Sequence, residues 1–317
     1  MKAVLINTPL HLQHDPKVVD TLQWIRSDLE MYEWSVIDCF ADTGQSVHET
    51  LEEKQPDVVF CYDYNAGDGS NLRDICEHHK IPEVFSPSPA LTLFLNKKKT
   101  KEIAYRYGFR VLRDVLVSPE KAVPKINFMG PYIVKPLFGG DSRGITGNNV
   151  FYTSDEALKQ ATTVSEKEQS PYMIEEYVGG DSVREIALFC FPTGESWLYA
   201  TIEYKYDFPV EQKFRYLSKQ IKDFPEDWQL RLSLYKESQA EKISVSSINF
   251  FKAIGAFGVL RAEFIVKKDE VILLEINGIP GINECFYLTA EANGISRSEL
   301  TDKMFAGTIA KQRLKSI

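Results

Sequence analysis

The first 85 residues alternate between short apolar runs and longer segments with helical spacing. The apolar runs are rich in β-branched residues and occupy residues 2–7, 35–40 and 56–62, and the helical segments between them are residues 16–32 and 46–54. This order predicts a parallel sheet with helices on its faces. Because ligands bind beyond the carboxyl ends of the strands in such sheets, the loops 7–16 and 63–70 are candidate ligand-binding loops. Plain turn chemistry is the alternative for the first loop.

Composition excludes several classes of protein. The chain has 317 residues, of which 44% are hydrophobic and 26% are charged, as is typical of a globular protein with two or three subdomains. Its net charge of −8 argues against nucleic acid as the principal partner. The sequence has no apolar run of the roughly 18 residues that span a bilayer, so we expect no membrane partner. The N-terminus is expected to form a strand and not a signal peptide.

Cysteine and histidine narrow the chemistry further. The five cysteines are widely separated and include no C-x-x-C pair, which predicts reduced thiols in the cytoplasm and no zinc site. All five histidines lie in the first quarter of the chain. A catalytic triad or metal site built on histidine is therefore excluded from the last three quarters. The carboxylates, amides, lysines and arginines that remain there suit a hard cation such as Mg²⁺.

Later segments predict two further units of mixed helices and strands. A helix is expected over residues 87–109, followed by a strand over 113–119. The second unit begins near Phe128 and is expected to contain strands 130–136 and 172–178 and helix 154–164. The third unit is expected to contain strands 184–191, 196–204, 259–267 and 270–278 and helices 241–255 and 296–312, with a hairpin turn at Lys267–Glu270. The polar stretch 205–238 has the length of a lid or a substrate-binding loop.

A lysine and a glycine-rich loop form the first candidate site. Lys135 ends an apolar strand, and Gly139, Gly140, Ser142 and Gly144 follow it. Glycine lets backbone N–H groups approach and hold an anion such as phosphate. The order of a Walker A motif is absent, and a tight turn is the alternative interpretation.

Two groups of charged residues flank this loop. Glu175 and Glu176 end a predicted strand, in which adjacent side chains take opposite faces, so at least one should face solvent or a ligand. A simple strand edge is the alternative. The earlier helix carries the run Lys97, Lys98, Lys99 and Lys101. We expect a solvated helix face for Lys98 and Lys99, and Lys97 is the candidate ligand-binding residue.

The strongest signal lies in the two strands of the predicted hairpin. Arg261 and Glu263 are two residues apart in one strand and therefore share a face. Glu275 and Asn277 share a face of the next strand for the same reason. If the strands pair, these side chains converge, and two carboxylates with an amide oxygen would suit Mg²⁺ bridging phosphates. Arg261 would neutralise a transferring phosphoryl group, and a structural cluster of ion pairs is the alternative.

Five segments, taken in this order, resemble ATP-grasp enzymes of the D-alanine–D-alanine ligase-like branch. They are residues 67–109, 132–146, 173–180, 250–266 and 273–283. The resemblance covers roughly residues 67–300, and its specificity comes from the ordered set and not from any single motif. It implies an ATP-grasp fold that combines α/β and α+β units.

The resemblance implies three subdomains that grip ATP. Residues 1–90 would form a Rossmann-like N-terminal subdomain, and residues 91–180 a central subdomain with the lid and the glycine-rich loop at about 128–180. Residues 181–317 would form the C-terminal subdomain with the metal site. ATP would bind between the last two subdomains, and a homodimer through the N-terminal unit is a family expectation.

The resemblance also implies residues that bind ATP and the metal ion. Lys97 and Lys135 would contact the phosphates, and the loop with Gly139, Gly140 and Ser142 would close over them. The adenine end would be lined by Glu175, Glu176 and Val178, and the ribose would be held by Asp181 or Ser182. Glu263, Glu275 and Asn277 would hold Mg²⁺, with Mn²⁺ as an alternative. Arg261 would face the transition state, with Lys213 and Ser142 as the other catalytic candidates.

The implied reaction joins a carboxylic acid to an amine through an acyl phosphate with release of ADP. Two departures from the family suggest altered substrates. The loop 7–16 has no Glu to hold a donor amino group, with Asp15 or His11 as replacements, and Asn283 and Cys285 stand in a Ser/Thr-rich acceptor loop. We therefore expect an amino acid ligase of specialised metabolism. The alternatives are a D-alanine–D-alanine ligase of cell-wall synthesis, a phosphoryl transferase, and an ATP-binding module without turnover.

Overall fold

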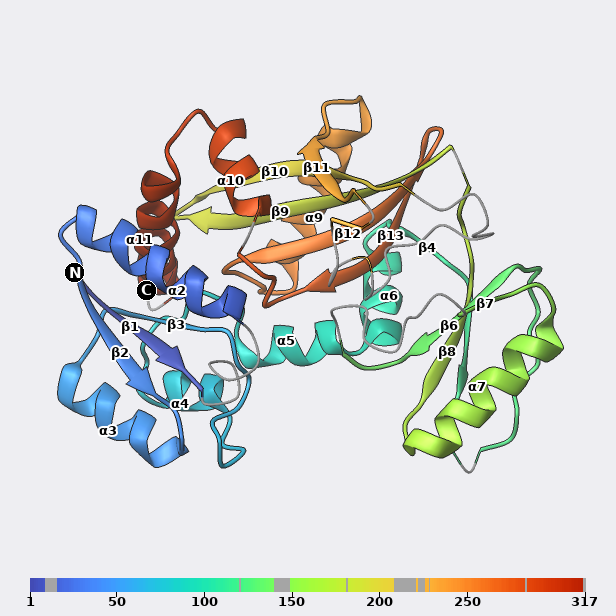
Figure 1. Cartoon of the computed structure of the whole chain (residues 1–317), viewed down its shortest axis with the longest axis horizontal. Coiled ribbons are helices and arrows are strands. Elements are labelled where there is room, and N and C mark those ends of the chain that lie inside the picture. The colour runs from blue at the N-terminus through green and yellow to red at the C-terminus, as the bar shows by residue number, and fades with distance from the viewer. Residues whose placement is uncertain are drawn as a thin grey trace.

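A computed structural model describes residues 1–8, 16–119, 121–139, 149–180, 182–207, 221, 226–227, 229–282 and 284–315. These residues form three sheets with helices packed on them (Figure 1). Across these ranges, no helix combines the length and the apolar character needed to cross a membrane.

The N-terminal sheet is parallel, as the alternating pattern predicts. Its order is β2–β1–β3, with strands β1 Lys2–Asn7, β2 Ser35–Phe40 and β3 Val58–Cys61 and helices α2 Pro16–Met31, α3 Gly44–Lys54 and α4 Leu72–His78. Val4 and Ile6 of β1 pack with α3 and α4, whereas Ala3 and Leu5 pack with α2 and the C-terminal helix α11 Arg297–Lys315. Both faces of the sheet are buried, which explains why its strands are apolar throughout.

The segment 87–109 forms two helices, and the prediction of one continuous helix is wrong. α5 runs over Ser88–Leu95 and α6 over Lys97–Arg106, and Asn96 between them has an extended backbone. The Asn96 side chain caps α6 by accepting a hydrogen bond from the Lys99 N–H, and its backbone bridges to Phe138. The cap and the bridge together outweigh helical continuity. As a result, Lys97 is the first residue of a helix.

A four-stranded antiparallel sheet forms the second unit. Its order is β5–β8–β6–β7, with strands β5 Asp114–Val117, β6 Tyr132–Pro136, β7 Val150–Phe151 and β8 Tyr172–Glu176. Helix α7 Ser154–Glu168 packs Ala157 and Ala161 on this sheet. Its N-terminus has a capping box in which Thr153 and Glu156 exchange hydrogen bonds.

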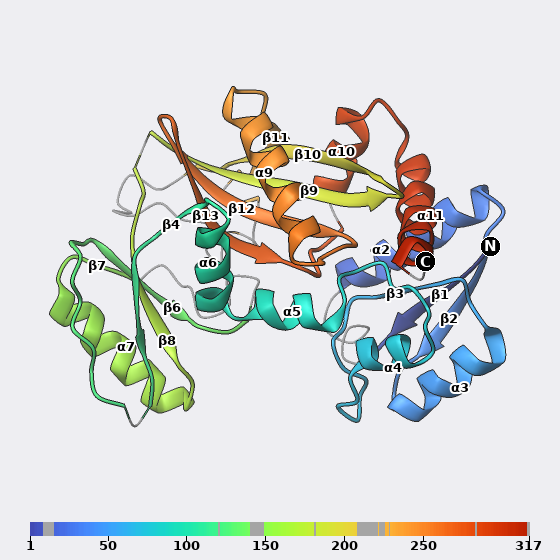
Figure 2. The same ribbon diagram turned by 180° about the vertical axis from the view of Figure 1, so that it is seen from behind.

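The largest sheet has six strands in the order β11–β10–β9–β12–β13–β4. They are β4 Arg110–Val111, β9 Val183–Thr193, β10 Ser196–Lys205, β11 Arg231–Leu234, β12 Leu260–Lys267 and β13 Glu270–Asn277. Helix α9 Gln239–Ala253 covers one face beside α6, and α10 Glu284–Ala292 and α11 cover the other (Figure 2). The short edge strand β11 lies inside the polar stretch 205–238, where the sequence predicts only a loop. The three-subdomain boundaries stay a prediction.

Candidate active site

The hairpin of β12 and β13 brings the predicted metal ligands together. The strands pair antiparallel around the turn at Lys267–Glu270, as the sequence predicts. Glu263 lies directly opposite Glu275. Arg261 lies directly opposite Asn277. All four side chains therefore start from one small area of the six-stranded sheet.

A β-bulge decides which face of β13 these side chains occupy. The register shifts by one residue after Glu263, so Leu274 has no directly opposite partner. Leu273 and Ile276 both pack in the core beneath α9 although they are three residues apart. Without the bulge, Leu274 would lie opposite Glu263, and Glu275 would point into that apolar core.

Arg261 is held rigidly by one of the two carboxylates. Its side chain is buried, and Glu263 Oε1 lies 3.0 Å from its Nε and 2.8 Å from its Nη2. Burial alone would lower the pKa of the guanidinium, but the neighbouring Tyr204 and Glu263 outweigh it and raise the pKa above its ordinary value. Arg261 therefore places a fixed positive charge beside the carboxylates.

Glu275 differs from Glu263 in that no cation of the described residues is in direct contact with its carboxylate. Among the residues that the structure describes, the half-buried Glu275 carboxylate forms no ion pair or hydrogen bond. Asn277 Oδ1 accepts a hydrogen bond of 2.9 Å from the Ile279 N–H, which orients its amide. The carboxylate oxygens of Glu275 are thus available to a ligand on the same face as Glu263.

Lys97 lies between the second and third units. It is 6% exposed, and its Nζ donates a hydrogen bond of 2.5 Å to the carbonyl oxygen of Gly139. Burial lowers the pKa of the Lys97 ammonium, and the charge of Glu275 opposes that shift. Lys97 therefore lies within the electrostatic field of the hairpin, as expected of a phosphate-binding residue.

A buried network of ion pairs links α6 to the four-stranded sheet. Glu175 is 1% exposed and contacts two lysines, with Oε1 lying 2.5 Å from Lys101 Nζ and Oε2 lying 2.5 Å from Lys135 Nζ. Lys101 Nζ also lies 2.8 Å from Asp114 Oδ2. Lys98 Nζ lies 2.7 Å from the other oxygen of Asp114. Lys135 is therefore held by a buried carboxylate at the end of β6.

The remaining described candidates lie around this network. Glu176 takes the face opposite to Glu175, as strand alternation predicts, and its Oε2 lies 3.2 Å from Arg113 Nε. Val178 packs against an apolar cluster that contains Ile265 and Ile272. Ser182 is exposed. Gly139 has a φ of 94°, which other residues rarely adopt. Their contacts with a nucleotide stay predictions.

Several predicted site residues lie outside the described part of the chain, so the geometry given above does not include them. They are Gly140, Ser142, Gly144, Asp181 and Lys213, together with His11, Asp15 and Asn283. The roles that the sequence assigns to them stay predictions.

Sequence analysis did not single out Lys101, Asp114 or Tyr204. Lys101 lies four residues after Lys97, and this helical spacing places both lysines on one buried face of α6. Tyr204 is half-buried with its hydroxyl oxygen 3.8 Å from Cys285 Sγ, and burial raises the pKa of that thiol. No sequence spacing connects Tyr204 with Cys285, because the pairing depends on α10 packing against β10.

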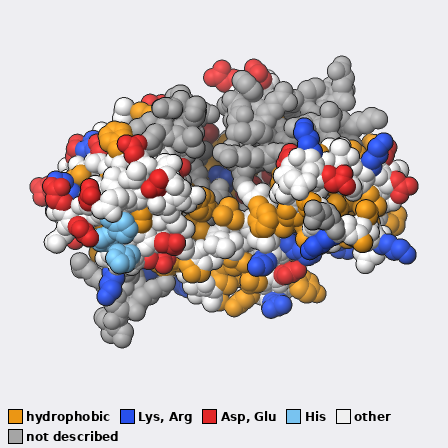
Figure 3. Space-filling model, turned by 90° about the horizontal axis from the view of Figure 1, so that it is seen from below, with side chains coloured by type: hydrophobic (Ala, Val, Ile, Leu, Met, Phe, Trp, Pro, Cys, Tyr) orange, Lys and Arg blue, Asp and Glu red, His pale blue; other side chains and the backbone are white. Residues whose placement is uncertain are grey.

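Three histidines form a second cluster, on the surface of the N-terminal unit (Figure 3). His48 Nδ1 lies 2.8 Å from His79 Nε2, and the ring of His78 lies 5.6 Å from that of His48. Within the described ranges, however, no group of three or more His, Cys, Asp or Glu side chains is arranged to hold a metal ion. The opposed carboxylates of the hairpin, with Asn277, are therefore the better candidate for a hard cation.

Two comparisons of sequence match this chain to known proteins. The family model described as D-ala D-ala ligase C-terminus matches residues 116–306. The D-alanine–D-alanine ligase of Beijerinckia indica is 27% identical over 275 residues, which cover 82% of this chain and 83% of that protein. The D-alanine–D-alanine ligase of a Sulfurovum species is 26% identical over 215 residues, which cover 68% of this chain and 59% of that protein.

A solved structure has the same fold. The D-alanine–D-alanine ligase from Bacillus anthracis, complexed with ATP, matches with a TM-score of 0.75 over 99% of both chains, at 18% sequence identity. This likeness confirms the predicted ATP-grasp fold, with an N-terminal parallel sheet and two further α+β units.

Proposed function

The chain belongs to the D-ala D-ala ligase C-terminus family and is an ATP-dependent, ADP-forming carboxylate–amine ligase, and on this premise we propose that it joins an amino acid or another small carboxylic acid to an amine through an acyl phosphate. The observation that carries the proposal is the direct opposition of Glu263 and Glu275, of which, within the described part of the chain, only Glu263 is in contact with Arg261. Like charges opposite each other destabilise a sheet. The arrangement therefore favours a cationic ligand between the strands.

The donor set of the hairpin fits a divalent cation. Hard cations prefer carboxylate and amide oxygens, and the Glu275 carboxylate has no partner among the described residues. Glu263, Glu275 and Asn277 would hold Mg²⁺, with Mn²⁺ as an alternative. The ion would supply shielding of phosphate charge.

In the first proposed step, a carboxylate oxygen of the donor attacks the γ-phosphorus of ATP. The bond from that phosphorus to the β–γ bridging oxygen breaks, and ADP leaves with the bonding electrons. Lys97, Lys135 and Arg261 balance the negative charge on the phosphate oxygens. This step is needed because hydroxide is a poor leaving group and phosphate is a better one.

In the second proposed step, the nitrogen of a neutral amine attacks the acyl carbon. Phosphate leaves with the electrons of the C–O bond, and the nitrogen loses a proton to form the amide. The protein contributes mainly by holding the two reactants together and by excluding water from the acyl phosphate.

Product analysis tests this proposal. The protein is incubated with ATP, Mg²⁺ and pooled amino acids, and phosphate release is measured alongside mass spectrometry of the products. We expect a particular acid and amine to stimulate phosphate release, with one amide formed for each phosphate. Phosphate release without any amide product would overturn the ligase proposal in favour of simple phosphoryl transfer.

D-Alanyl-D-alanine synthesis is the second candidate, and the names of the relatives favour it. No comparison supports the specialised pathway that the altered loops suggest. D-Alanine is therefore the first substrate to test, alone and paired with every other amino acid. D-Alanine as the best donor and acceptor would favour cell-wall synthesis, whereas another pair would favour a different pathway.

The proposed setting of the reaction is the cytoplasm. All five cysteines are buried and none of them forms a disulfide, as suits a reducing compartment. A homodimer through the N-terminal unit is part of the same proposal. Analytical ultracentrifugation would test it, since a sedimentation coefficient of a monomer at micromolar concentration would contradict it.

A further inference from the structure

Lys101 connects two units of the molecule through buried contacts. Its Nζ lies 2.5 Å from Glu175 Oε1 on β8 and 2.8 Å from Asp114 Oδ2 on β5, and its side chain is 3% exposed. Both partners belong to the four-stranded sheet, whereas α6 packs Ala104 on the six-stranded sheet. Lys101 therefore fixes the position of the four-stranded sheet against α6.

The contacts of Lys101 also determine where Lys135 lies. Glu175 has two oxygens, and each contacts one lysine, Lys101 at Oε1 and Lys135 at Oε2. Because Glu175 is 1% exposed, water cannot replace a lost lysine without rearrangement. The orientation of the carboxylate, and with it the position of the Lys135 ammonium, therefore depends on Lys101.

We propose that Lys101 is a positioning residue for ATP binding, which acts through Glu175 to hold the Lys135 ammonium where it meets a phosphate group. This inference rests on the proposed function, because it takes Lys135 as a phosphate ligand. Lys101 acts without touching the nucleotide, since two carboxylates enclose its ammonium group.

The charge balance of the network supports this role. At Glu175 itself, two ammonium groups, from Lys101 and Lys135, face one carboxylate, which leaves 2 − 1 = 1 positive charge. A phosphate can neutralise that charge. Without Lys101 this group has no excess positive charge, and Lys135 is paired more tightly with Glu175. The loss of Lys101 therefore weakens the attraction for phosphate as well as misplacing Lys135.

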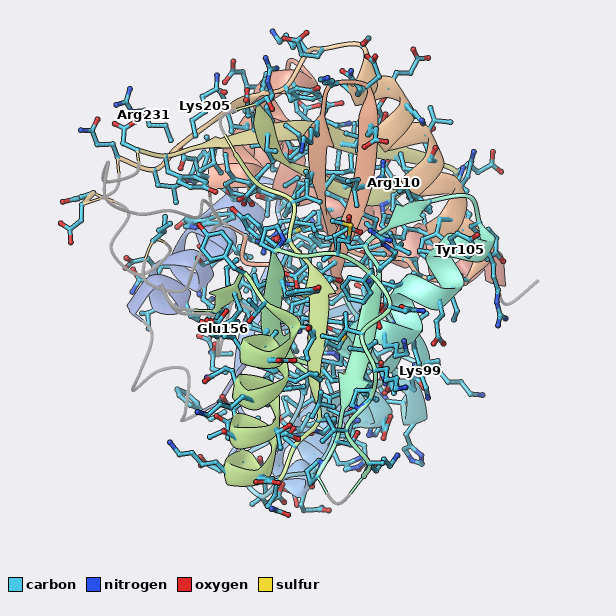
Figure 4. All side chains as sticks on the ribbon, turned by 90° about the vertical axis from the view of Figure 1, so that its right-hand side faces the viewer. Lys99, Tyr105, Arg110, Glu156, Lys205 and Arg231 are labelled. Carbon is cyan, nitrogen blue, oxygen red and sulfur yellow. The ribbon has the colours of Figure 1, made fainter. Side chains whose placement is uncertain are left out.

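The test compares neutral variants of three lysines on α6 by calorimetric titration with Mg·ATP. Lys101→Met is expected to raise the ATP dissociation constant about tenfold, since a charge-assisted hydrogen bond is misplaced. Lys98→Met, which loses a contact with Asp114 but none with Glu175, and Lys99→Met, whose side chain points into solvent (Figure 4), are matched controls. Both controls are expected to bind ATP within about twofold of wild type.

Two further readouts separate positioning from a loss of structure. At saturating ATP, kcat of Lys101→Met is expected to stay within about threefold of wild type while KM for ATP rises, because only binding is affected. The groups that face Glu175 are Lys101 on α6 and Lys135 on β6. Loss of Lys101 raises the pKa of Glu175, which is held below its ordinary value because the two lysines outweigh its burial. ATP affinity of the variant should therefore fall as the pH is lowered, more steeply than in wild type.

The outcomes are distinguishable. Lys101→Gln replaces Lys101→Met if the latter does not fold, and it carries the same expectations because its amide lacks the charge that holds Glu175. Lys101→Arg keeps that charge and is expected to restore most of the ATP affinity. Unchanged ATP affinity in the folded neutral variant, while Lys135→Ala weakens binding, would overturn the role of Lys101 alone. Unchanged ATP affinity in Lys135→Ala would overturn the phosphate site and this inference together.

Discussion

Two buried arginine–glutamate groups in this protein differ in their charge balance. In the N-terminal unit, Arg73 on α4 faces one carboxylate, with its Nε 2.9 Å from Glu83 Oε2. Its Nη1 and Nη2 donate to the carbonyl oxygens of Asp63 at 2.5 Å and Cys61 at 2.7 Å. Arg73 therefore holds the end of β3 with protein groups alone.

In the hairpin, by contrast, two carboxylates face one guanidinium. Arg261 binds Glu263, and Glu275 lies opposite Glu263 with no cation in contact with it among the described residues, although its charge acts on Lys97. A balanced pair needs no ligand, whereas an excess of buried acid is costly until a cation arrives. The comparison suggests that Arg73 and Glu83 support the fold and that the hairpin is used for binding.

The largest effect is expected when the balanced pair of Arg73 and Glu83 is broken. Arg73→Met should lower the free energy of unfolding by about 3–5 kcal/mol, because it leaves the Glu83 carboxylate buried without its partner. Urea denaturation measures this change. The exposed Arg106, at the end of α6, supplies the matched control, since Arg106→Met should change stability by less than about 0.5 kcal/mol.

The same variant has a predictable dependence on pH. Burial raises the pKa of Glu83 to about 7 against the opposing charge of Arg73, and removal of Arg73 raises it further. A carboxyl group whose pKa is raised on folding contributes most stability at low pH and loses it as the pH rises through the folded pKa. The stability deficit of Arg73→Met should therefore be larger at pH 8 than at pH 5. Equal deficits at both values would contradict this interpretation of Glu83.

The second effect tests the unbalanced group. Glu275→Gln should lower kcat by about 10²–10³, as expected when one electrostatic contact in a transition state is lost. Its melting temperature should not fall, because the change removes repulsion between Glu263 and Glu275. Glu270→Gln, an exposed change at the start of the same strand, is the control for activity. More than a tenth of the wild-type activity in Glu275→Gln would refute the metal assignment.

A third change tests the cationic side of the site. Lys135→Ala should weaken ATP binding by roughly 30-fold, or about 2 kcal/mol, because it removes a charge-assisted contact with phosphate. Titration with Mg·ATP measures this loss. Lys159→Ala, an exposed change on α7 of the same unit, should leave the affinity unchanged.

The smallest effect concerns the histidines of the N-terminal unit, far from the hairpin chemistry. Burial lowers the pKa of His79, and His48 and His78 add to that shift. A histidine whose pKa is lowered on folding makes the folded state lose stability as the pH falls through its unfolded pKa, about 6.5. The free energy of unfolding of His79→Gln, relative to that of wild type, should therefore be higher at pH 5.5 than at pH 8. If wild type and His79→Gln show the same pH dependence of stability in urea denaturation, the lowered pKa of His79 does not contribute to it.

The sequence predicts those strands and helices whose spacing of apolar residues follows directly from which of their faces are buried. β1 and β3 are apolar throughout because both faces of their sheet are covered, and β12 and β13 are separated by two residues that suit a turn. The break at Asn96 was missed because its cause is a bridge to Phe138, more than 40 residues away in the chain. The edge strand β11 was missed because its alternation of Arg231 and Ser233 with Leu232 and Leu234 covers only four residues within a polar stretch.

The candidate site likewise contains residues that could be predicted from the sequence and residues that could not. Residues two apart on a strand share a face, which is why Arg261 and Glu263 could be predicted together. The role of Lys101 depends on Glu175, and that contact forms only when α6 docks against another sheet. The bulge at Leu274 leaves no clear signal in composition, because the three residues from Ile272 to Leu274 are all apolar.

That bulge gives the hairpin a parity. Loss of Leu274 would remove only the extra residue and leave a regular ladder, in which Glu275 still lies opposite Glu263. Loss of both Leu273 and Leu274 would instead place Glu275 opposite Phe264, on the core face. A gap of a single position here, in an evolutionary alignment or an engineered strand, should therefore be less harmful than a gap of two.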